Sequence, residues 1–213
     1  SNVSKNSHEE IFLVSLKNKD LSDTNCGPYT YSWGNIEKKI KVFSYYLKNI
    51  ISKDDRCVLL SENRPEWLIS DLAIMNAGGV TVPLFTTYSH RDYEYILKDC
   101  QPKVCIVSNV DQFKKIKNLI TENTIVISID RVEEKIEFFE NIFLETNTDF
   151  KTSVKSVVPY NNNLKRNDLA CIIYTSGTTG NPKGVMLSHG GILSNCEGAQ
   201  EILKSLIKKN PPV

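Results

Sequence analysis

One loop of the chain is rich in glycine, hydroxyl and lysine residues and follows directly on an apolar run: Ile173-Tyr174-Thr175-Ser176-Gly177-Thr178-Thr179-Gly180-Asn181-Pro182-Lys183-Gly184. Glycines let backbone N–H groups approach an oligophosphate, hydroxyl groups donate to its oxygens, and a lysine adds positive charge. The composition therefore predicts a phosphate-binding loop. Hairpin loops of similar composition are also common without a ligand, so composition alone leaves a purely structural turn open.

This loop departs from the phosphate loop of P-loop kinases and NTPases. That motif ends in Gly-Lys-Ser/Thr and leads directly into a helix, whereas here Lys183 is followed by Gly184 and then by the apolar run Val185-Met186-Leu187. So short an apolar run predicts a strand. We therefore expect the loop to join two strands as a hairpin, with residues 169–174 as the buried strand that precedes it.

Outward from the loop, short β-branched runs alternate with amphipathic helices. Further strands are expected at residues 57–60, 80–84, 103–107 and 124–129. Helices are expected at residues 33–50, from Pro65 to the Gly78-Gly79 pair, from the Ser89/Asp92 capping box through Leu97, and at residues 111–120 and 190–208. A weaker helical signal covers residues 131–149, and residues 150–166 are expected to be a polar connection. This alternation predicts an α/β fold with a mainly parallel sheet covered by helices on both faces.

The same pattern suggests a division of the chain into two parts. Residues 1–54 are expected to form an N-terminal segment with an amphipathic helix, and residues 55–213 an α/β subdomain that carries the phosphate loop. Trp67, Met75 and Tyr93 recur at helical spacing, so we expect them in the core rather than at a substrate.

Composition excludes several classes of protein. The 213 residues carry 26 basic and 25 acidic side chains, so the net charge of +1 gives no reason to expect nucleic-acid binding. No apolar run approaches the roughly 20 residues that span a bilayer. The six cysteines form no Cys-x-x-Cys pair, which favours reduced, mostly buried thiols in a cytoplasmic protein. They are Cys26, Cys57, Cys100, Cys105, Cys171 and Cys196.

The complete string from Thr175 to Gly184, flanked by Tyr174 and by the Val-Met-Leu-Ser-His run that ends at His189, resembles the phosphate loop of the adenylate-forming superfamily. That superfamily includes acyl-CoA synthetases, adenylation domains and luciferases. Residues 54–67 and 71–84 resemble further segments of it, in the same order. The Glu-Asn-Arg-Pro-Glu-Trp and Val-Pro-Leu-Phe-Thr-Thr runs within and just after these segments are more typical of long-chain fatty-acid–CoA ligases.

The resemblance implies a two-step reaction with ATP, a fatty acid and CoA as substrates and Mg²⁺ as the metal. A carboxylate attacks the α-phosphate of ATP to give acyl-adenylate and pyrophosphate, and the CoA thiol then displaces AMP. The residues that match the family's loop are Thr175, Ser176, Gly177, Thr178, Thr179, Gly180 and Lys183. Thr175 is the candidate hydroxyl ligand of Mg²⁺, and Lys183 either faces the phosphates or holds the loop. His189 is more typical of a structural hydrogen-bonded group than of a catalytic one.

The chain departs from the family in length, because the family's enzymes continue well beyond the last motif present here. The resemblance therefore implies the first lobe of the large domain, as an incomplete N-terminal fragment that does not adenylate alone. Two alternatives remain: a stand-alone ATP-binding module without catalysis, and a P-loop kinase or NTPase. Peripheral membrane association of a full enzyme and the oligomeric state stay open.

Overall fold

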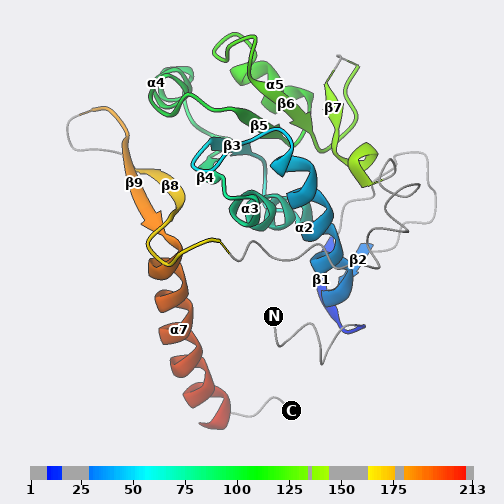
Figure 1. Cartoon of the computed structure of the whole chain (residues 1–213), viewed down its shortest axis with the longest axis vertical. Coiled ribbons are helices and arrows are strands. Elements are labelled where there is room, and N and C mark those ends of the chain that lie inside the picture. The colour runs from blue at the N-terminus through cyan, green and yellow to red at the C-terminus, as the bar shows by residue number, and fades with distance from the viewer. Residues whose placement is uncertain (1–8, 16–28, 134–135, 144–162, 176–179, 210–213) are drawn as a thin grey trace.

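The computed structural model describes residues 9–15, 29–133, 136–143, 163–175 and 180–209. Within them the chain builds a two-stranded antiparallel sheet and a seven-stranded, mainly parallel sheet flanked by helices (Figure 1). The predicted fold class, α/β with a mostly parallel central sheet, is confirmed.

The large sheet has the strand order β7-β6-β5-β3-β4-β8-β9, and every neighbouring pair in it is parallel except β8 and β9. Its strands are β3 (Arg56–Leu60), β4 (Val80–Leu84), β5 (Val104–Val107), β6 (Ile125–Ser128), β7 (Glu137–Phe138), β8 (Leu169–Thr175) and β9 (Lys183–Ser188). Strands β3, β4, β5, β6 and β8 lie where the apolar runs predict them. Parallel strands need crossover connections, and the helices between them provide these.

The described helices are α2 (Trp33–Lys48), α3 (Pro65–Ala77), α4 (His90–Cys100), α5 (Val110–Ile116) and α7 (His189–Lys209). Their starts follow local capping chemistry. The Ser32 side chain accepts from the backbone N–H of Asn35 at the start of α2, and Ser89 and Asp92 form the predicted capping box of α4. At the end of α3, Gly78 takes the left-handed conformation, with φ of 95°, that terminates helices.

Helices cover both faces of the large sheet, as predicted. On one face α2 and α3 pack over alternate strand residues, including Cys57 and Leu59 of β3. On the other face α4 and α5 pack over the intervening residues, including Val58 and Leu60. Because successive side chains of a strand point to opposite faces, one run of four buried residues in β3 serves two cores.

Three elements differ from the sequence-based expectation. A weak helical signal was expected over residues 131–149, but β7 (Glu137–Phe138) is a short strand that pairs in parallel with β6. Of the described residues in this range, only 139–143 are helical. Helix α5 ends at Ile116, before the predicted residue 120. Strand β1 (Ile11–Ser15), which pairs with β2 (Tyr29–Ser32), was not predicted. Such short strands are stabilised by pairing, which a single sequence does not reveal.

The predicted core face of α3 is also partly wrong. Its fully buried residues include Ile69, Ala73 and Ile74. Trp67 is half-buried but packs against this core, whereas Met75 is only half-buried. The apolar side chains of this helix lie on most of its sides, so periodicity alone could not say which side faces the sheet. Tyr93, by contrast, is 1% exposed in the core, as expected.

At the other end of the sheet, β8 and β9 form the predicted antiparallel hairpin, and α7 follows directly after it. Figure 1 shows α7 extending away from the sheet beyond β9. Among the described residues, no helix is both long and apolar enough to cross a membrane.

Candidate functional site

The predicted phosphate loop lies at the carboxyl edge of the parallel strands. Strand β8 runs parallel to β4, so the end of β8 at Thr175 lies at the same edge as the end of β4 at Leu84. In open α/β sheets, ligands bind outside the carboxyl ends of the strands. The loop therefore occupies the position that this architecture offers to a ligand.

Two of the predicted site residues face each other across the mouth of the hairpin. Thr175, the last residue of β8, pairs with Lys183, the first residue of β9, and both side chains are exposed. Directly opposed residues of an antiparallel pair have Cβ atoms about 4.5–5.5 Å apart. The hairpin thus brings one hydroxyl and one ammonium group together at the edge where a phosphate would bind. Ser176, Gly177, Thr178 and Thr179 lie outside the described residues.

The two described glycines of the loop, Gly180 and Gly184, are each required for a different structural reason. Gly180 has φ of 93°, a left-handed conformation that costs other residues energy, and nothing lies within 4 Å of the Cβ it lacks. At Gly184 a Cβ would meet Cγ2 of Ile172 at 2.9 Å and Cζ of Tyr174 at 3.3 Å. Glycine is therefore needed for the turn at the first position and for close strand packing at the second.

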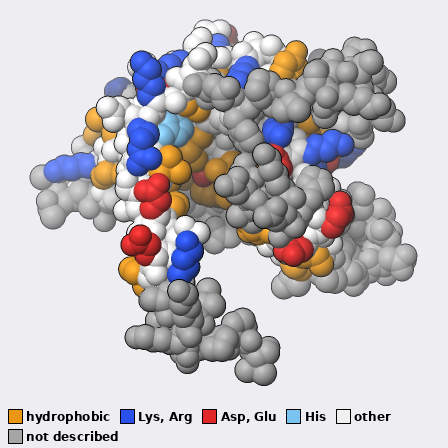
Figure 2. Space-filling view, turned by 60° about the horizontal axis from the view of Figure 1, so that its bottom comes forward, with side chains coloured by type: hydrophobic (Ala, Val, Ile, Leu, Met, Phe, Trp, Pro, Cys, Tyr) orange, Lys and Arg blue, Asp and Glu red, His pale blue; other side chains and the backbone are white. Residues whose placement is uncertain are grey.

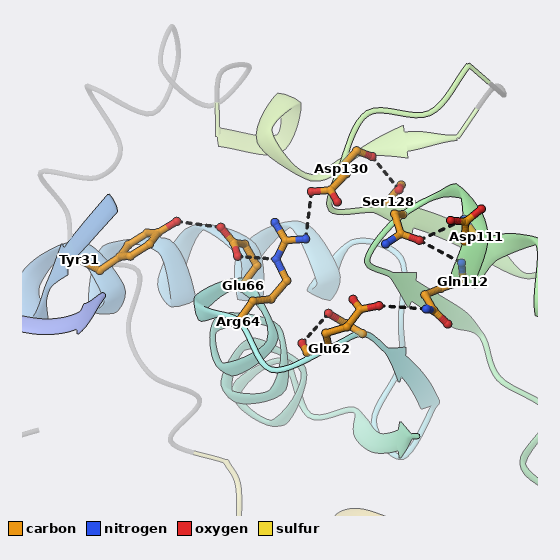
Figure 3. Close-up of polar contacts among 10 residues, drawn as sticks. Tyr31, Glu62, Arg64, Glu66, Asp111, Gln112, Ser128 and Asp130 are labelled. Atoms are coloured by element: carbon orange, nitrogen blue, oxygen red, sulfur yellow. Dashed lines mark hydrogen bonds and ion pairs between the residues drawn. The ribbon is translucent and has the colours of Figure 1, made fainter. Parts of the chain in front are cut away.

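A network of charged and polar side chains extends along the same edge of the sheet toward α5 and β6 (Figure 3). Arg64 donates to Glu66 at 2.8 Å and lies 3.0 Å from the Asp130 carboxylate, and the Tyr31 hydroxyl donates to Glu66 at 2.8 Å. Burial alone would raise the pKa of Glu66, but the charge and hydrogen bond of Arg64, together with hydrogen bonds from a backbone N–H and from Tyr31, outweigh it and lower that pKa. This network joins β2, the start of α3 and the end of β6.

A second network of polar side chains lies beside the first. Gln112 donates to Glu62 at 3.0 Å, and the Lys115 ammonium donates to Gln112 at 2.9 Å and to the carbonyl of Thr86 at 2.6 Å (Figure 3 shows the Glu62 and Gln112 contact). Thr86 belongs to the connection that follows β4, the strand next to β8. Neither network was predicted, because the residues in each are distant in sequence and carry no motif.

His189 lies at the first position of α7 rather than at the end of a strand. Its backbone N–H donates to the carbonyl of Asp168, and burial lowers the pKa of its imidazole, partly opposed by the Asp168 charge. Its Nε2 atom is buried without a hydrogen-bond partner in the described structure. The predicted side-chain hydrogen bond is therefore not seen at Nε2 in the described part of the chain, and the structural role of His189 stays a prediction.

The described residues hold no ready-made metal site. They contain no group of three or more His, Cys, Asp or Glu side chains placed to hold an ion. Mg²⁺ commonly binds through one or two carboxylates together with substrate phosphates, and in some phosphate loops a Ser or Thr hydroxyl also contacts the ion. The exposed hydroxyl of Thr175 fits a site of that kind, in which the nucleotide supplies most of the ligands.

Known proteins similar to this chain include two fatty-acid-activating enzymes. The chain is 33% identical over 153 residues to the fatty acyl-CoA synthetase A of Dictyostelium discoideum, an alignment of 70% of this chain and 23% of that protein. It is 29% identical over 180 residues to the long-chain-fatty-acid–CoA ligase of Bacillus subtilis (strain 168), covering 74% and 32%. The chain thus spans about a quarter to a third of the length of these relatives.

Two further comparisons establish the fold and the family. The structure of ATP-bound MatB from Rhodopseudomonas palustris matches with a TM-score of 0.61 at 23% identity, over 88% of this chain and 34% of that one. The family model described as AMP-binding enzyme matches residues 7–209, nearly the whole chain. Because this match covers far more than half of the chain, the chain belongs to the AMP-binding enzyme family.

Proposed function

We propose that this chain is the N-terminal portion of an AMP-forming long-chain fatty-acid–CoA ligase and supplies its phosphate loop. In the proposed reaction a carboxylate oxygen attacks the α-phosphorus of ATP, the bond to the β-phosphate oxygen breaks, and pyrophosphate leaves. The sulfur of CoA then attacks the acyl carbon and AMP leaves, while the thiol proton passes to solvent. The observation that carries the proposal is the pairing of exposed Thr175 with exposed Lys183 at the carboxyl edge of the sheet.

The substrates are inferred from the relatives. Both sequence relatives named above are fatty acyl-CoA synthetases or ligases, and the structural relative was solved with ATP bound. These names support a fatty acid, CoA and ATP as the small-molecule substrates of the whole protein.

The loop residues are assigned complementary roles. Thr175, Ser176, Thr178 and Thr179 offer hydroxyl groups, Gly177 and Gly180 allow close approach of backbone N–H groups, and Lys183 adds positive charge. Such donors, fixed in advance around the phosphates, stabilise the charge that grows there as pyrophosphate leaves. Thr175 would hold Mg²⁺ together with phosphate oxygens, and the ion would neutralise part of that charge.

The remaining half of the site is proposed to come from polypeptide outside these residues. On β9 and α7, large apolar side chains are exposed, among them Met186 at 71%, Ile202 at 64% and Leu203 at 55%. Figure 2 shows hydrophobic side chains around a hollow on one side of the molecule. Contiguous exposed apolar surface marks an interaction site in most proteins. We therefore infer that the chain alone binds ATP without adenylating a fatty acid.

A cytoplasmic location is also inferred. Cys57, Cys100, Cys105 and Cys171 are buried free thiols. Free cysteines are typical of reducing compartments.

Product analysis tests the proposed reaction. We would join this chain to the C-terminal portion of the Bacillus subtilis ligase and incubate the hybrid with Mg²⁺, ATP, CoA and a long-chain fatty acid, with the natural ligase as control. Fatty-acid-dependent formation of AMP and pyrophosphate is expected, and Lys183→Ala should reduce it. Formation of ADP and orthophosphate instead would indicate a kinase or NTPase. ATP bound without turnover would favour a stand-alone binding module.

A further inference from the structure

Contacts with helix α4 hold the residue that precedes the candidate phosphate loop. Tyr174, the residue before Thr175, is 3% exposed, and its ring packs in the core beside α4. Its hydroxyl donates to the carboxylate of Asp99, the penultimate residue of α4, at 2.5 Å. Short O–H···O⁻ hydrogen bonds of this kind are about twice as strong as neutral ones. The last turn of α4 therefore fixes the side chain that precedes the loop.

The connection that leads into α4 holds the backbone at the same point. The Tyr88 hydroxyl donates to the carbonyl of Tyr174 at 3.0 Å. Tyr88 is itself held by edge-to-face contacts with Phe85 and Tyr93, with ring centroids 5.3 and 6.0 Å apart. One residue of β8 is thus restrained through both its carbonyl and its side chain.

The far side of the loop meets the same helix at its other end. Arg91, in the first turn of α4, donates to the side-chain oxygen of Asn181 at 3.4 Å. Strand β9 then closes directly over the Tyr174 ring, because Gly184 has no Cβ to keep the strands apart. Contacts from α4 and the connection before it therefore reach both ends of the loop.

We propose that Asp99 is a positioning residue for the phosphate loop, acting through the Tyr174 hydroxyl to orient Thr175 toward ATP. This inference rests on the proposed function of the loop. The proposed role of Asp99 needs no contact with the nucleotide. Its effect comes from preorganisation, since donors held in place before binding lose little freedom when the phosphates arrive.

The test compares four variants of the chain. Asp99→Leu removes the acceptor, Asp99→Asn keeps an acceptor oxygen at the same place, and Glu94→Leu is the control at an exposed position of the same helix. Two quantities are measured: amide hydrogen exchange at Thr175, Lys183 and Gly184, and the Kd for Mg·ATP by calorimetry. Asp99 is exposed, so the fold should survive, and circular dichroism checks this. Tyr174→Phe provides a second variant that removes the same bond.

We expect Asp99→Leu and Tyr174→Phe to accelerate exchange and to weaken ATP binding about tenfold, the size of the cost of ordering one or two loosened side chains when the phosphates bind. Asp99→Asn, which keeps a neutral acceptor, should recover about half of both effects, and Glu94→Leu should match the unmodified chain. Equal exchange in Asp99→Leu and Glu94→Leu would overturn the positioning role, as would faster exchange with unchanged ATP affinity. Failure of the unmodified chain to bind ATP would instead refute the proposed function, while exchange would still report whether Asp99 holds the loop.

Discussion

Glu66 shows how a charged side chain is buried at this edge of the sheet. It is 3% exposed, and its carboxylate is held by Arg64 and by the Tyr31 hydroxyl. The sequence predicts a helix that starts at Pro65, and Pro65 is indeed its first residue. The ion-pair network was not predictable, because Asp130 and Tyr31 reach the site only through sheet and core packing.

Replacing Arg64 should destabilise the fold in a pH-dependent manner. In Arg64→Met, Glu66 stays buried without its cation, which we expect to cost about 3 kcal/mol of unfolding free energy at pH 7. Because Arg64 lowers the pKa of Glu66, its stabilisation is present above the unfolded pKa of about 4.3 and is lost as the pH falls through the folded pKa. The variant and parent should therefore converge in stability at low pH.

Urea denaturation at pH 7 and pH 3 measures this difference, with Lys114→Met, an exposed change on α5, as the control. The Lys114→Met variant should stay within about 0.5 kcal/mol of the parent at both values. A loss for Arg64→Met that is as large at pH 3 as at pH 7 would show that lost packing, not charge pairing, explains it.

The ionisation of Asp71 should lower the stability of the fold as the pH rises, opposite to the effect of Glu66. Burial raises its pKa to about 6, above the unfolded value of about 3.9. The ionised form is thus disfavoured in the folded state, and stability is lost as the pH rises from about 4 through 6. We expect Asp71→Asn to raise the unfolding free energy at pH 7 by about 1–3 kcal/mol and to change nothing below pH 4. Thermal unfolding across pH 3–8, with Glu94→Gln as the exposed control, checks this, and a pH-independent gain would refute it.

At the scale of elements, the sequence was most informative where local chemistry fixes the backbone. The Ser89/Asp92 capping box and Gly78 mark helix ends as predicted, and Ser32 caps the helix that was expected from residue 33. It was least informative where the environment decides. The buried side of α3 and the strand at Glu137–Phe138 depend on neighbours that lie far along the chain, so neither follows from periodicity.

The hairpin offers a test at this scale. Gly184→Ala would push a methyl group to within 2.9 Å of Ile172 and force β8 and β9 apart, at a cost of about 1–3 kcal/mol. Gly198→Ala in α7 meets nothing within 4 Å and should instead stabilise the helix by about 0.5–1 kcal/mol. Thermal unfolding of both variants compares the same chemical change at two sites. Equal effects would mean that Gly184 is not required for strand packing.

At the scale of the molecule, the α/β class and the two covered faces followed from the alternation of strands and helices, because parallel strands require crossovers between them. Family membership followed from the loop motif and is shown by the match over residues 7–209. The division at residue 54 stays a prediction. So does the role of each loop residue, since side-chain roles depend on a bound nucleotide.

The central claim is that the Thr175 to Lys183 loop binds the phosphates of ATP. Calorimetric titration of Mg·ATP into the chain tests it most directly, with Lys183→Ala beside Lys103→Ala, an exposed lysine next to the opposite, amino-terminal end of β5. We predict saturable binding that Lys183→Ala weakens about tenfold, as expected for the loss of a charge-assisted contact, and that Lys103→Ala leaves unchanged. Absence of binding, or equal Kd values for the two variants, would contradict the account.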